Sequence, residues 1–195
     1  MGSHWGALVD RTAPNILPGT ILETVDKLID WNLAVFEKDG VTVKVAYNGA
    51  ANVGDTVNVT YEGQQYLALI QEEQPDQELN KHVCVKVNDT PASPAVFGVF
   101  LDWESDPESE EEDEDGIKGK WNDMQVASLG NYFIRIAPNE TVSIGDLIEA
   151  DGTGCGRVQS DDIIRSKTVG KITSTIKQKV YADGSYLVTA VLHCG

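Results

Sequence analysis

The segment from Glu149 to Gln159 contains three glycines within five residues, a spacing that could serve a ligand. Such glycines hold phosphates, wrap calcium or turn the chain between two strands. A Walker loop is excluded, because the nearby pair Gly170-Lys171 has Arg165 in place of the first glycine. The spacing G-x-G-x-G does not match a dinucleotide loop, and Leu147 occupies the first ligand position of a calcium loop. The glycines are therefore predicted to form a turn.

This turn would join two strands, predicted at residues 146–150 and 155–159. A tight connection of this length needs backbone conformations that favour glycine. We therefore expect a positive φ at Gly152 or Gly154, in a hairpin that holds no ligand.

Nucleophilic or metal chemistry would depend on the histidines and cysteines, three of each. His82 and Cys84 are two residues apart, so on a strand they would share a face, as a thiol–imidazole pair or half of a metal site requires. His193 and Cys194 are adjacent and would point to opposite faces. No C-x-x-C or H-x-x-x-H spacing accompanies either pair. Both are interpreted as strand residues in or near a core, and no catalytic, cofactor-binding or metal-binding residue is predicted.

The charge of the chain is concentrated in one run. The formal net charge is −16, and ten of the fourteen residues from Asp102 to Asp115 are acidic, which leaves −6 for the rest. Clustered like charges repel one another, so residues 102–120 are predicted to form a long solvent-facing loop between two strands, with divalent-cation binding and mimicry of DNA as the alternatives. Direct contact with nucleic acid is not expected, because it requires clustered Lys and Arg.

The sequence gives no sign of a membrane span or a secretion signal, since no apolar run approaches the roughly 18 residues that a span needs. Three widely spaced cysteines favour reduced thiols over a disulfide framework, which fits an intracellular setting.

Short segments rich in Val, Ile, Thr and Tyr make up most of the chain from Thr20 onward, and turn-forming groups separate them. Their spacing of about 8 to 12 residues predicts an all-β fold of small barrels or sandwiches. Residues 22–34 also have a weak helical pattern, and 161–167 could form a single helical turn. The predicted strands are 21–25, 33–37, 41–47, 56–61, 65–71, 82–87, 94–103, 124–129, 131–137, 146–150, 155–159, 168–175, 177–182 and 185–194.

We expect an extended N-terminal arm over residues 1–19, one β domain over 20–90 and a second over 91–195 that carries the acidic loop. Trp5 favours an arm that packs against a surface, and a disordered terminus is the alternative. The boundary follows from the prolines and small polar residues of Val87–Pro94.

One pattern occurs twice. The segments Asn52–Val57 and Ser143–Ile148 both place an apolar residue before Gly-Asp and a strand after it. Glycine supplies a positive φ and the aspartate side chain can accept backbone hydrogen bonds, so both segments are predicted to start a strand with the same kind of turn.

The C-terminal part of the chain, from Lys120 to Gly195, resembles the C-terminal part of structural proteins of tailed bacteriophages. Four motifs carry this resemblance: Gly145–Leu147, Asp162–Ser166, Thr168–Lys171 and Tyr181–Tyr186. The resemblance implies a β-rich component of the virion.

A looser similarity exists to the self-cleaving chaperone domains of phage tail appendages, which share a GDLL … VGK layout. That similarity implies a serine nucleophile with a partner base. Ser166, beside Lys167 and Asp162, is the nearest match in this sequence.

The resemblance and the residue pattern together lead to one hypothesis. The chain is expected to be a capsid decoration (cement) protein, non-enzymatic and without a cofactor. It would bind the major capsid protein and further copies of itself on the outside of the virion, after synthesis in the host cytoplasm. The alternatives are a tail or fibre-base component, a cysteine or serine autoprotease, and a carbohydrate- or cation-binding β-module.

Overall fold

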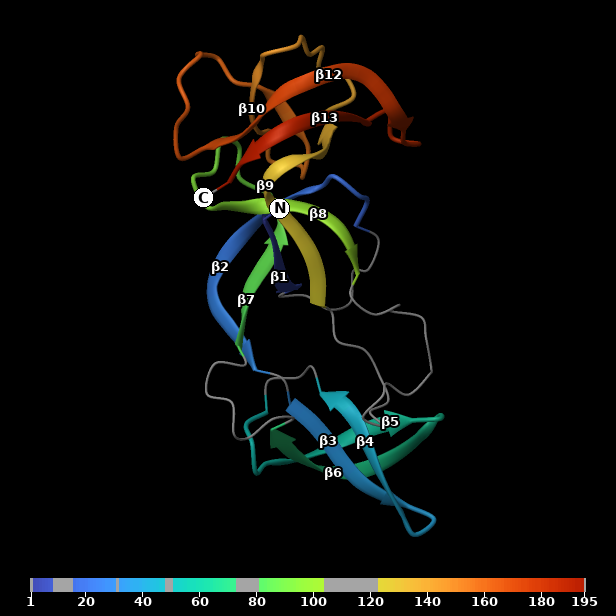
Figure 1. The fold of residues 1–195 in the computed structure, drawn as a ribbon. Coiled ribbons are helices and arrows are strands. Elements are labelled where there is room, and N and C mark those ends of the chain that lie inside the picture. The colour runs from blue at the N-terminus through green and yellow to red at the C-terminus, as the bar shows by residue number, and fades with distance from the viewer. Residues whose placement is uncertain are drawn as a thin grey trace. The chain divides into compact units, whose positions relative to one another are not determined.

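The computed structural model describes residues 2–8, 16–30, 32–47, 51–72, 81–103 and 123–194. These residues form thirteen β-strands and no helix, which confirms the predicted all-β fold (Figure 1). No helix long and apolar enough to cross a membrane occurs in this part of the chain. Most of the predicted acidic loop lies outside the described residues, apart from its first two positions at the end of a strand.

The strands belong to two compact units. Of the described residues, the first unit combines those within 1–27, 83–103 and 123–195, and the second combines those within 28–82. This grouping differs from the expected division near residue 90, because the strand that starts at Ile21 and the one that starts at Lys81 both pair in the first unit.

A five-stranded barrel forms part of the first unit. Its strands follow the order β1-β7-β2-β8-β9, and antiparallel pairing of β1 with β9 closes the ring. Residues 2–8 of the expected N-terminal arm therefore form a strand of this barrel, β1. The strands are β1 (Gly2–Leu8), β2 (Ile21–Asp30), β7 (Lys81–Val87), β8 (Val96–Trp103) and β9 (Asp123–Ile136).

The second half of β9 begins another ring of strand pairings, in the order β9-β11-β10-β12-β13, which closes where β13 pairs with β9. A single long strand thus serves both parts of the unit (Figure 1). The added strands are β10 (Leu147–Ala150), β11 (Gly156–Val158), β12 (Thr168–Val180) and β13 (Tyr186–His193).

Two clusters of buried apolar side chains fill the first unit. The smaller cluster centres on Phe100 and Met124, in β8 and β9. The larger one includes Ile134, Ile148 and Tyr186, from the strands around the second ring. Period-2 alternation along β13 places every second side chain in this core, as expected for a strand that is half buried.

Two predicted strand breaks were wrong. Residues 124–129 and 131–137 form one strand, β9, because Gly130 takes a φ of 111° within the strand and does not end it. Residues 168–175 and 177–182 likewise belong mainly to β12, in which the register against β13 shifts between Ser174 and Lys179. The possible helical turn at 161–167 is a loop, and residues 22–34 lie in strands wherever they are described.

The second unit contains a four-stranded antiparallel sheet in the order β4-β3-β6-β5. Its buried face is centred on Phe36, whose ring stacks on Tyr66 with 4.6 Å between the centroids. The strands are β3 (Asn32–Lys38), β4 (Val41–Tyr47), β5 (Thr56–Tyr61) and β6 (Gln64–Glu72).

The two Gly-Asp turns have the same geometry, as the repeated pattern predicted. Gly54 and Gly145 have φ values of 92° and 95°. Asp55 accepts a hydrogen bond from the backbone N–H three residues before it, at 2.9 Å, and Asp146 does the same at 2.7 Å. Each turn thus starts a strand in a different unit.

Candidate functional site

The glycine-rich segment is a hairpin between β10 and β11, in which Glu149 lies opposite Arg157. Gly152 and Gly154 have φ values of 92° and 79°, which confirms the predicted positive φ. Asp151 organises the turn, because its Oδ1 accepts the Thr153 N–H at 2.7 Å and the Cys155 N–H at 3.2 Å.

The glycines of this hairpin also allow other segments to approach closely. A Cβ added at Gly154 would lie 2.8 Å from a methyl of Val87, and one at Gly152 would lie 2.8 Å from the ring of Pro91. The Gly154 carbonyl accepts a hydrogen bond from the Ile21 N–H at 2.8 Å. The turn therefore packs closely against Ile21, Val87 and Pro91.

Two buried polar side chains, Asn88 and Glu23, connect the hairpin to the five-stranded barrel. The Gly152 N–H donates to the side-chain oxygen of Asn88 at 3.1 Å, and the Asn88 amide donates to Glu23 at 2.6 Å. Lys86 forms an ion pair with Glu23 at 3.0 Å and another with Asp89 at 2.7 Å. The Lys86 hydrogen bond holds the pKa of Asp89 below its usual range. These contacts fix the position of the hairpin.

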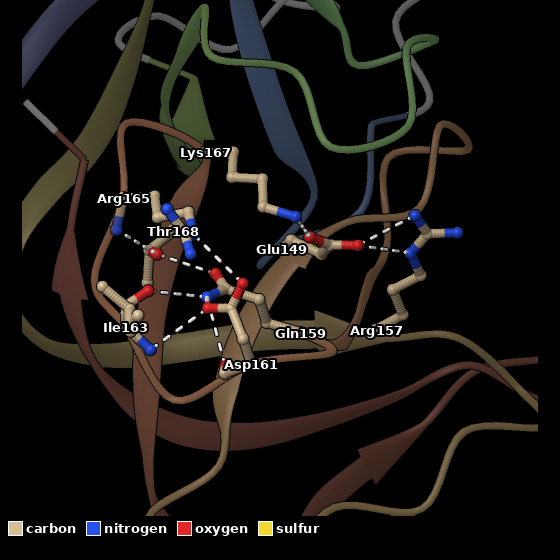
Figure 2. A network of polar contacts seen from close by, with 8 residues as sticks. All are labelled: Glu149, Arg157, Gln159, Asp161, Ile163, Arg165, Lys167 and Thr168. Carbon is tan, nitrogen blue, oxygen red and sulfur yellow. Dashed lines mark hydrogen bonds and ion pairs between the residues drawn. The ribbon is translucent and has the colours of Figure 1, made fainter.

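Glu149 is the central charge of the hairpin and is only 4% exposed. Figure 2 shows its carboxylate between Lys167 and Arg157, and Arg157 donates to it at 2.8 and 3.0 Å. Burial alone would raise the pKa of Glu149, but the hydrogen bonds from Lys167 and Arg157 outweigh it and hold the pKa below its usual range. Glu149 is therefore a paired structural carboxylate and not a proton donor near neutral pH.

The loop between β11 and β12, residues 160–167, is held by a second polar network (Figure 2). The buried amide of Gln159 donates to the backbone oxygen of Ile163 and to the carboxylate of Asp161, both at 2.8 Å. Thr168 donates to the Gln159 oxygen at 2.7 Å and accepts the Arg165 N–H at 2.9 Å. Two buried polar residues thus fix the course of an exposed loop.

Asp161 lies at the centre of this loop. It accepts hydrogen bonds from the Ile163 N–H at 3.1 Å and from the Arg165 side chain at 3.0 Å. The Ile163 N–H and the Gln159 amide lower the pKa of Asp161 from its usual value. The carboxylate is therefore ionised at neutral pH and engaged within its own loop.

A shallow hollow of about 410 Å³ lies beside this loop. Leu147 and Val158 contribute its apolar wall, and Asp146, Asp161 and Asp162 contribute carboxylates. In the described residues, no three His, Cys, Asp or Glu side chains are grouped as a metal site would require.

The three cysteines are all buried. Burial raises the pKa of Cys155, and it raises the pKa of Cys194 to about 12. The Cys194 thiol donates to the Val169 carbonyl at 3.3 Å. A buried protonated thiol is a poor nucleophile. Cys84 lies in the core as predicted, whereas the side chain of its neighbour His82 lies outside the described residues.

In the described part of the chain, no hydrogen bond links Ser166 to Lys167 or to Asp162. Lys167 donates to Glu149, while Ser166 and Asp162 are exposed side chains of the loop. A general base must contact the nucleophile, and the Lys167 ammonium is engaged by the carboxylate of Glu149.

Arg135, which the sequence analysis did not single out, connects distant parts of the first unit. Its guanidinium donates to Ser185 at 2.7 Å and to Thr20 at 3.2 Å, and it forms an ion pair with Asp183. It also lies over the ring of Tyr181, 5.5 Å from the centroid. The turn YADGSY at 181–186 provided a local signal, but nothing near Arg135 in the sequence indicated its partners.

The polar groups around Glu149, Gln159 and Arg135 stabilise the fold of the first unit. Their ion pairs and hydrogen bonds connect segments of this unit that are separate in sequence. No protein-family model matches the chain, and neither does any curated protein or solved structure.

Proposed function

We propose that this chain is a structural protein of a tailed-bacteriophage virion, and specifically a decoration protein that binds the major capsid protein and stabilises the head. It acts without catalysis and without a cofactor. The proposal rests on the resemblance of residues 120–195 to phage structural proteins.

The observation that carries the proposal is the place of the four motifs in the fold. Gly145–Leu147 forms the turn before β10, and Gly145 and Asp146 bond to Ile172 of β12 at 2.9 Å each. Thr168–Lys171 starts β12, and Tyr181–Tyr186 forms the turn that follows it. Asp162–Ser166 lies in the loop fixed by the Gln159 network.

All four motifs therefore encode structural parts of one folded unit. Such a set is expected when proteins share an architecture, whereas a shared active site would gather reactive side chains. The internal pairing of Glu149 and the raised pKa of Cys194 support the same conclusion.

The charge of the chain suits the outer face of a capsid. With a formal net charge of −16, the protein would be repelled by packaged nucleic acid and would remain soluble before assembly. Further copies of the same chain and the major capsid protein are the proposed partners.

Quantitative mass spectrometry of purified heads tests this function. A decoration protein is expected on full heads in a number comparable to that of the major capsid protein. Its removal should lower the temperature at which heads release their genome, and adding the purified protein should restore it. A few copies per particle, confined to tails, would show a tail or fibre-base component instead.

Intact-mass measurement of the purified protein tests the protease alternative. We expect one unchanged mass after prolonged incubation. A shorter product that disappears in Ser166→Ala would overturn the non-enzymatic assignment.

A further inference from the structure

The loop at 160–167 presents two adjacent isoleucines to solvent. Ile163 is 54% exposed and Ile164 is 60% exposed. Ile144, in the turn before β10, is 72% exposed. Single exposed apolar residues are ordinary on protein surfaces, but grouped ones with a polar surround mark interaction sites.

Each of the two segments that carry these isoleucines also contributes residues to the hollow described above. Gly145, which follows Ile144, and Asp162, which precedes Ile163, both line it. The three isoleucines therefore belong to two segments that both contribute to this one hollow.

Hydrogen bonds within the chain order the loop that carries Ile163 and Ile164 before any partner binds. Ile163 is held through its backbone on both sides, since its oxygen accepts from Gln159 at 2.8 Å and its N–H donates to Asp161 at 3.1 Å (Figure 2). Lys167 is tied to the buried Glu149. A loop ordered before binding loses little conformational entropy when a partner arrives, so its apolar contacts contribute more fully to affinity.

The charge of the hollow indicates what the partner carries. Three aspartates line it: Asp161 forms an ion pair with Arg165, Asp146 accepts the Ser143 N–H, and Asp162 is exposed. Leu147 and Val158 provide apolar wall beside them. A lysine or arginine fits such a surface, because its aliphatic stem packs on apolar groups while its charged head meets carboxylates.

We propose that Ile163, Ile164 and the adjoining hollow form the surface through which this chain docks on the outer face of the capsid shell, against an apolar patch that presents a lysine or arginine. This inference rests on the proposed function. It adds the contact surface and the chemistry of the partner.

Rebinding to heads stripped of the protein tests the proposal. Ile163→Asp and Ile164→Asp should each weaken binding by about tenfold or more, because they place a charge in an apolar contact. Asp162→Lys should weaken binding through charge repulsion, and this variant keeps both isoleucines. Ile176→Asp, at a 67% exposed position in β12, is the matched control and should bind like wild type.

The outcomes separate the two proposals. If wild type does not rebind to stripped heads, the proposed function fails. If wild type binds and the Ile163, Ile164 and Asp162 variants bind as well as Ile176→Asp, the docking surface is wrong and the function stands. Sedimentation velocity completes the test: a wild-type oligomer that these variants dissociate, with head binding unchanged, would assign the surface to a second copy and overturn the proposal.

Discussion

Replacing Glu149 by glutamine keeps the shape of the side chain and removes its charge, and we expect a large loss of stability. Removing one partner of a buried ion pair costs about 3–5 kcal/mol. The side chains of Arg157 and Lys167 are 41% and 24% exposed and can turn toward water. This lowers the expected cost to about 2–3 kcal/mol, or roughly 8–12 °C in Tm for a unit of this size.

The effect of Glu149→Gln should depend on pH with a definite sign. The pKa of Glu149 is lower in the folded state than in the unfolded chain, so the ionised carboxylate stabilises the fold above its unfolded pKa of about 4.3. This contribution is lost as pH falls through the lower, folded pKa. The difference in the free energy of unfolding between wild type and variant should therefore be largest at neutral pH. It should shrink toward zero as the pH falls below about 4.

Differential scanning calorimetry between neutral pH and about pH 3 measures both effects and can separate the transitions of the two units. Glu72→Gln, the same change at an exposed position in β6, is the control and should leave both transitions in place. A Glu149→Gln variant as stable as wild type at neutral pH would refute the role of the ion pairs. A difference that persists undiminished in acid would refute their electrostatic origin.

Two further predictions concern packing and reactivity. Gly19→Ala should destabilise the first unit by about 3 kcal/mol in urea unfolding, because φ is 82° and the new Cβ would lie 2.5 Å from Leu187 Cδ2 and 2.9 Å from the backbone nitrogen of Arg135, which cannot turn aside. Gly40→Ala, with a φ of 78° and open space around it, should cost only about 1–2 kcal/mol, and equal costs would contradict the steric argument. The three cysteines should resist a thiol reagent at about pH 8 and react on unfolding in guanidinium, since all are buried and the pKa of Cys194 is about 12. Rapid labelling of the folded protein would count against this burial.

The all-β fold could be predicted because its signals are local. Alternating apolar residues and frequent turn-forming groups reflect strands that bury one face, and β5 follows this alternation along its whole length. The turns at Gly54 and Gly145 were predicted for the same reason, since glycine followed by aspartate encodes their geometry within four residues.

Strand pairing and strand continuity could not be predicted. Gly130 has the sequence character of a turn, yet hydrogen bonds on both sides of it keep β9 continuous. The pairing of β1 with β9 joins residues more than a hundred positions apart, and no local pattern specifies such a partner.

The candidate site divides in the same way. The hairpin conformation at Gly152 and Gly154 was predictable from the spacing of the glycines, whereas the hydrogen bonds and ion pairs that surround the hairpin were not. Arg135 bonds to Ser185 and Thr20, which are 50 and 115 residues away, and Gln159 looked like an ordinary strand residue. Their roles follow from tertiary positions that a single sequence does not reveal.

The two outermost described strands meet on β9 at one residue, because Gly2 and His193 both pair with Leu129. Neighbouring strands are about 4.8 Å apart, so Gly2 and His193 lie within about 10 Å of each other. A short engineered linker could therefore join β13 to β1 in a circular permutant, with new ends opened at the exposed turn of Glu62 and Gly63. A peptide fused before β1 and one fused after β13 would leave the fold at nearly the same point, so a cargo attached through either end would occupy the same place on the protein.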